Sequence, residues 1–168
     1  EYPILHIDLN SRRYENAESL RLELNKYLEI WERRYGDEFK DRALEERFFQ
    51  IIAKAYEKTG QRVVILVDEY DKPMLQAIGD EALQDEYRNT LKAFYSVLKT
   101  QDRYIKFAFL TGVTKFGKVS VFSDLNNLKD ISMDNRYIDI CGVTETEIHD
   151  NFDEDVSELG RLNAMTKD

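Results

Sequence analysis

Val63-Val64-Ile65-Leu66-Val67-Asp68-Glu69 places five consecutive strand-forming apolar residues directly before two adjacent carboxylates. A run that is apolar on both faces is typical of a central parallel strand, because helices cover both sides of such a sheet. The pattern therefore predicts a strand over residues 62–69, with Asp68 and Glu69 at its carboxyl end. Open α/β sheets bind their ligands at that end.

Apolar spacing elsewhere predicts strands that alternate with helices. Three further strands are predicted over residues 4–9, 105–111 and about 137–143. Apolar residues at three- and four-residue steps predict helices within residues 16–36, 44–60 and 83–98. Asn16 is the predicted N-cap of the first helix and Gly36 its end, and Thr144 with Glu147 matches a capping box that opens a later helix. The charged residues between the apolar positions are interpreted as solvent-facing sides of these helices.

Composition bounds the class of protein. The chain has 168 residues, of which 42% are hydrophobic, and this predicts one globular domain over residues 1–168. Its net charge of −9 disfavours contact with nucleic-acid backbones or anionic membranes. Cys141 is the single cysteine, which excludes an internal disulfide and a cysteine zinc site. We expect a cytoplasmic protein.

Four ordered blocks of the sequence resemble the predicted AAA-ATPase-like family: residues 63–73, 109–116, 125–132 and 141–148. Members of that family are bacterial P-loop proteins, and many carry a C-terminal domain of the PD-(D/E)XK nuclease superfamily. The resemblance implies a P-loop NTPase-like fold, with a parallel sheet and helices on both faces. It identifies the strand over residues 62–69 as the Walker B strand and the strand over 105–111 as the sensor strand.

The phosphate-binding loop of that family is absent from this sequence, which contains no G-x-x-x-x-G-K-[ST] motif. The resemblance places this loop and the first strand upstream of Glu1, so the chain is interpreted as a fragment. We expect such a fragment to bind ATP weakly or not at all, because the loop supplies the backbone N–H groups and the lysine that hold the phosphates. We also expect a gap in the centre of the sheet, which pairing with a second copy or rearrangement would fill.

The resemblance assigns roles to three residues at the strand ends. Asp68 is the candidate ligand of Mg²⁺, and Glu69 is the candidate base that orients and deprotonates a water. The alternative for both is a pair of solvated turn acids. Thr111 matches the sensor position that contacts the terminal phosphate of ATP. Its alternative role is a hydroxyl that satisfies the neighbouring backbone.

Several other polar residues have open or structural assignments. Lys115, Lys118 and Arg136 are candidates for supplying positive charge to a phosphate or to the site of a neighbouring subunit, and solvated loop residues are the alternative. Asp71 matches the Asp-Lys-Pro extension of the family, but the sequence explains no role for it beyond a turn cap or an ion pair. Asp8 also ends a strand and is assigned a structural role.

Three functions compete at this point. The first is the core of an ATPase switch that repositions an attached effector such as a nuclease. The second is a degenerate P-loop module that only contacts other proteins. The third is a nuclease metal site built from acids and a lysine, for which Glu38-Phe39-Lys40 is the matching E-x-K pattern, although it falls between helices. His6, His149 and Cys141 form no pattern typical of a zinc site or a nucleophilic triad.

Overall fold

The computed structural model describes residues 1–36, 39–113, 121–122, 127–140 and 142–163. Contacts divide the chain into two compact units, Glu1–Asn127 and Leu128–Asp168, which are described separately. Of the helices in the described part, none is long and apolar enough to cross a membrane.

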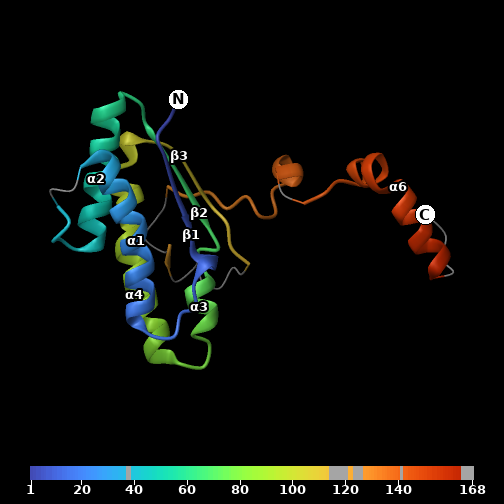
Figure 1. Ribbon diagram of the computed structural model, residues 1–168, viewed down its shortest axis with the longest axis horizontal. Coiled ribbons are helices and arrows are strands. Elements are labelled where there is room, and N and C mark those ends of the chain that lie inside the picture. Colours follow the sequence, from blue (N-terminus) through green and yellow to red (C-terminus); the bar gives the residue numbers. More distant parts are fainter. Residues whose placement is uncertain (37–38, 114–120, 123–126, 141, 164–168) are drawn as a thin grey trace. The chain divides into compact units, whose positions relative to one another are not determined.

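The first unit is built on a parallel sheet of three strands in the order β1-β2-β3 (Figure 1). They are β1 (Ile4–Asp8), β2 (Val63–Asp68) and β3 (Ile105–Leu110), which confirms three of the four predicted strands. The central β2 pairs with both neighbours, and Ile65 lies between Leu5 and Ala108. The three strands are adjacent in the sheet, so the expected gap does not lie between any two of them.

Local chemistry accounts for several of the helix ends. They are α1 (Ala17–Tyr35), α2 (Leu44–Thr59), the short α3 (Lys72–Gln76) and α4 (Glu81–Thr100). The Asn16 side chain accepts a hydrogen bond from the Ser19 N–H at the start of α1, and Gly36 ends this helix. Gly60 ends α2 with a left-handed φ of 66°, which glycine adopts without steric cost.

The core lies between the long helices and one face of the sheet, and α1, α2 and α4 occupy the same side of it in Figure 1. Phe48 links the helices, with its ring centroid 5.9 Å from that of Trp31 and 4.4 Å from that of Phe94. On the opposite face of the sheet, Ile4 and Phe107 are each 52% exposed. Helices were predicted on both faces of the sheet. Among the described residues of this unit, the long helices cover one face only.

Some charged residues of the helices are buried, so the interpretation of all of them as solvent-facing is wrong. Arg47 of α2 and Glu32 of α1 are each 5% exposed, and the guanidinium donates to both carboxylate oxygens at 2.7 and 2.8 Å. A third nitrogen of Arg47 donates to Asn25 Oδ1 at 2.6 Å. Burial is tolerated here because each charge has a partner and hydrogen bonds.

The second unit contains the 3₁₀ helix η3 (Asn135–Ile140) and α6 (Glu145–Leu162). The predicted strand over about 137–143 is therefore wrong for its described residues. The Asp134 carboxylate accepts from the Arg136 N–H at 3.1 Å, and the Asp134 carbonyl accepts from the Tyr137 N–H at 2.9 Å. These local bonds favour a turn over an extended strand. The capping box of Thr144 and Glu147 at the start of α6 is confirmed.

Candidate functional site at the carboxyl edge of the sheet

The ends of β2 and β3 bring Asp68 and Thr111 into direct contact. The Thr111 hydroxyl donates a hydrogen bond to Oδ1 of Asp68, although the two residues are 43 positions apart. The backbone fixes this meeting, because the Thr111 N–H donates to the Val67 carbonyl at 2.8 Å. The Asp68 side chain is exposed, so its carboxylate is accessible from solvent while one oxygen is held by the threonine.

Glu69 follows Asp68 in an unusual backbone conformation. Its φ is 55°, and it is the one residue other than glycine with positive φ in the part of the chain that the structure describes. A left-handed conformation costs a residue with a Cβ about 1–2 kcal/mol, and such strain is concentrated at functional sites. Its carbonyl accepts from the Lys72 N–H at 3.0 Å, which closes the turn into α3. The sequence offered no signal for this conformation, since glutamate rarely adopts it.

The next two residues of the turn point into the protein. Tyr70 is 7% exposed and packs against Phe122, with ring centroids 4.9 Å apart. Asp71 is 1% exposed, and its Oδ1 accepts from the Val113 N–H at 3.2 Å. The sequence left the role of Asp71 open between a turn cap and an ion pair, and the structure shows it as a buried carboxylate that binds the backbone of Val113.

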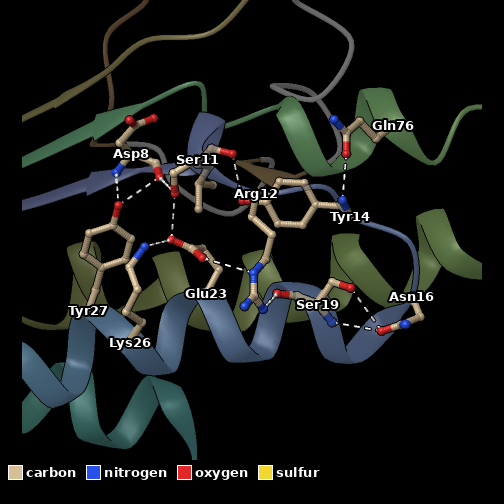
Figure 2. Close-up of polar contacts among 11 residues, drawn as sticks. Asp8, Ser11, Arg12, Tyr14, Asn16, Ser19, Glu23, Lys26, Tyr27 and Gln76 are labelled. Atoms are coloured by element: carbon tan, nitrogen blue, oxygen red, sulfur yellow. Dashed lines mark hydrogen bonds and ion pairs between the residues drawn. The ribbon is translucent and has the colours of Figure 1, made fainter.

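Asp8 ends β1 and is the register partner of Asp68. Its Oδ1 accepts from the Asn10 N–H at 2.8 Å, which caps the short 3₁₀ helix η1 (Leu9–Ser11). The Tyr27 hydroxyl donates to the Asp8 carbonyl at 2.9 Å and accepts from the Asp8 N–H at 3.1 Å (Figure 2). These contacts agree with the structural role assigned to Asp8.

Figure 2 also shows a buried carboxylate that sequence reasoning missed, Glu23 of α1. It is 2% exposed, accepts from the Ser11 hydroxyl at 2.9 Å, and lies 3.4 Å from Nε of Arg12 and in contact with Lys26. Burial, followed by the charge of Glu23, raises the pKa of the neighbouring Tyr14 hydroxyl above its ordinary range. The spacing of Lys26 from Glu23 was visible in the sequence, whereas its contacts with residues 11 and 12 depend on the fold.

The remaining predicted site residues either lie outside the described residues or belong to the second unit. Lys115 and Lys118 lie outside the described residues, as do Cys141 and Glu38 of the E-x-K pattern. Arg136 belongs to the second unit and donates to Oδ2 of Asp134 at 2.6 Å. His149 pairs with Asp153 at 3.3 Å. Within the described ranges, no three His, Cys, Asp or Glu residues are grouped so that they could hold a metal by themselves.

Comparisons with known proteins place the chain among relatives. A family profile described as predicted AAA-ATPase matches residues 1–122. The chain is 41% identical over 160 residues to a protein of Azotobacter chroococcum mcd 1 named as an uncharacterized protein in the vnfD 5′ region. That alignment covers 95% of this chain and 31% of the relative, so the chain spans about a third of the relative's length. No solved structure matches the chain significantly.

Proposed function

The chain belongs to the AAA-ATPase-like family, and we propose that it forms part of the core of a P-loop ATPase whose nucleotide cycle repositions an attached effector domain. One observation carries this proposal. Asp68 and Thr111 meet at the carboxyl ends of two adjacent parallel strands, where the Thr111 hydroxyl binds the Asp68 carboxylate, and Glu69 directly follows Asp68. This is the edge of an α/β sheet at which ligands bind.

The donor set at this edge suits Mg²⁺. Asp68 offers an exposed carboxylate, and Thr111 places a hydroxyl oxygen beside it. Mg²⁺ in nucleotide enzymes is held by one or two carboxylates together with waters and substrate phosphates, so a cluster of three acids is not required. Asp68 would hold the ion, which when bound supplies charge neutralisation to the phosphates of ATP.

Glu69 is the proposed base. It directly follows Asp68, and at Glu69 the backbone leaves the extended conformation of β2 for a left-handed one. A carboxylate beside the metal ligand can accept a proton from a water and orient that water for attack. The cost of the left-handed conformation is consistent with a residue retained for its chemistry and not for stability.

Thr111 is the proposed sensor. Its hydroxyl donates to Asp68 in the structure, and it can exchange this acceptor for an oxygen of the terminal phosphate. Lys115, Lys118 and Arg136 remain proposed sources of positive charge for the phosphates. Arg136 would have to exchange its pairing with Asp134 to act in this way.

Coupling to an effector is also part of the proposal. The relative is about three times as long as the part aligned here, which leaves room for further domains in that protein. By resemblance to the family, a nuclease-like domain is the proposed effector. We expect residues 1–168 alone to bind ATP weakly, since they contain no phosphate-binding motif.

The test is ATP hydrolysis by a full-length protein that contains this chain. Glu69→Gln should lower kcat by roughly 10²- to 10⁴-fold, the usual contribution of a general base, while bound ATP accumulates. Glu57→Gln is the matched control, because Glu57 is an exposed residue of α2 whose partner is Lys54 at 3.6 Å.

Three results would contradict parts of this proposal. Unchanged turnover in Glu69→Gln would remove Glu69 from its role. Absence of Mg²⁺-ATP binding in calorimetry of the full-length protein would favour a degenerate P-loop module that contacts other proteins. Mg²⁺-dependent DNA cleavage by residues 1–168 would favour a nuclease.

A further inference from the structure

We propose that Asp71 is a positioning residue that ties the turn after β2 to the end of β3 and so keeps Thr111 against Asp68. This inference rests on the function proposed above, because the pair that Asp71 positions is the proposed site. The supporting contact is the hydrogen bond from the Val113 N–H to Oδ1 of Asp71, at 3.2 Å.

Asp71 continues the pairing of two strands beyond the point where their backbones can pair. Within the ladder, the Thr111 N–H donates to the Val67 carbonyl at 2.8 Å, and the Tyr70 N–H donates to the Thr111 carbonyl at 2.9 Å. After Tyr70 the chain turns into α3, and the Asp71 carbonyl accepts from the Leu75 N–H at 3.0 Å. The side chain of Asp71 therefore supplies the acceptor that the helical backbone no longer offers to Val113.

Close packing at Gly112 supports the same assignment independently. A Cβ added at Gly112 would lie 2.6 Å from Cε1 of Tyr70 and 2.7 Å from Oδ1 of Asp71. Both separations are too short for real carbon contacts, so only glycine allows the end of β3 to approach the turn this closely. The Tyr70 ring is itself held against Phe122.

The turn after β2 thus places two aspartates in different environments. The Asp68 side chain is exposed and contacts Thr111, whereas Asp71 is 1% exposed and contacts the backbone that follows Thr111. Glu69 lies between them in its left-handed conformation. Because residues 67–71 and 111–113 are joined by four hydrogen bonds, loss of the one that Asp71 accepts should allow Thr111 and Glu69 to shift together.

The experiment compares Asp71→Ala with Asp71→Asn in the full-length protein. Alanine removes the acceptor, while asparagine keeps an oxygen at the same position without the charge. The first readout is the split between kcat and KM for ATP. The second is hydrogen exchange at the Val113 amide, which does not depend on activity. Asp80→Ala is the control, because Oδ1 of Asp80 also accepts a backbone N–H, that of Leu83 at 3.0 Å, but does so at the start of α4.

We expect Asp71→Ala to lower kcat by roughly 10- to 100-fold, the range for misplaced catalytic groups, with KM changed less than about threefold. Exchange at Val113 should accelerate. Asp71→Asn should keep kcat within about threefold of the wild type and retain the protection of Val113, as should Asp80→Ala. The inference would be overturned if Asp71→Ala left kcat and Val113 exchange unchanged, or if Asp71→Asn lost as much as alanine.

Two outcomes separate this inference from the proposed function. If the wild-type protein does not hydrolyse ATP, the proposed function fails, and Val113 exchange in the two variants still decides whether Asp71 joins the turn to β3. If Asp71→Ala does not fold, Asp71→Asn decides alone. Retained kcat and protection support the positioning role, and a large loss of either refutes it.

Discussion

The buried ion pair between α1 and α2 provides the sharpest test of the packing. Arg47→Met replaces the arginine with an uncharged side chain of roughly similar volume. It leaves the Glu32 carboxylate without its partner. The side chains of Arg47 and Glu32 are 6% and 5% exposed, so water has little access to hydrate the Glu32 carboxylate in place of the arginine. Two charge-assisted hydrogen bonds, at 2.7 and 2.8 Å, disappear together with the bond to Asn25.

The expected loss is about 3–5 kcal/mol of the free energy of unfolding, the usual cost of leaving one member of a buried pair alone. A domain is stable by about 5–15 kcal/mol, so this loss is about a fifth or more of the total. With a urea dependence of about 2 kcal/mol/M, the midpoint of unfolding should fall by roughly 2 M. Glu32→Leu combined with Arg47→Met should recover to within about 1 kcal/mol of the wild type, because no buried charge then remains unpaired.

The assay is urea unfolding followed by fluorescence of Trp31, the single tryptophan, which stacks on Phe48 beside Arg47. Arg33→Met is the matched control on α1. Arg33 pairs with Glu29 at 3.7 Å, and the two side chains are 76% and 51% exposed, so this change should cost less than about 0.5 kcal/mol. The reasoning fails if Arg47→Met costs no more than the control, or if the double variant is as unstable as the single one.

Two further predictions concern pH. Burial raises the pKa of Tyr14, Tyr87 and Tyr95 above the ordinary value of 10.0, so the stability they contribute is complete below pH 10 and is lost as pH rises further. In an alkaline titration of tyrosinate absorbance, these three of the ten tyrosines should ionise late or only with unfolding, and ionisation of all ten near pH 10 in folded protein would contradict this. Hydrogen bonds from the backbone and hydroxyl of Thr144 lower the pKa of Glu147 below 4.5, so their support of α6 is present at neutral pH and is lost as pH falls through that lowered value. Thr144→Ala should lower the helical circular dichroism at neutral pH and reduce its further change on acidification, and an unaltered acid transition would count against the capping box.

Features with local causes were predictable from the sequence, whereas features that depend on distant residues were not. The boundaries of α1 were predictable because Asn16 and Gly36 act on the backbone within a few residues of themselves. The strand expected over about 137–143 failed because Asp134 bonds the neighbouring backbone and favours a turn. The burial of Glu23 was not predictable, because Ser11 and Arg12 reach it only after the chain has folded.

The sequence by itself determined where the main strands and helices of the first unit lie and that Asp68 and Glu69 end a central strand. These features depend on apolar periodicity and on caps, which are written in neighbouring residues. Only the tertiary structure decided that Thr111 contacts Asp68, that Asp71 turns inward onto Val113, and that one face of the sheet in the first unit keeps exposed apolar side chains. Such pairings join residues about forty positions apart, and a local pattern carries no information on which distant partner will replace water around a polar group.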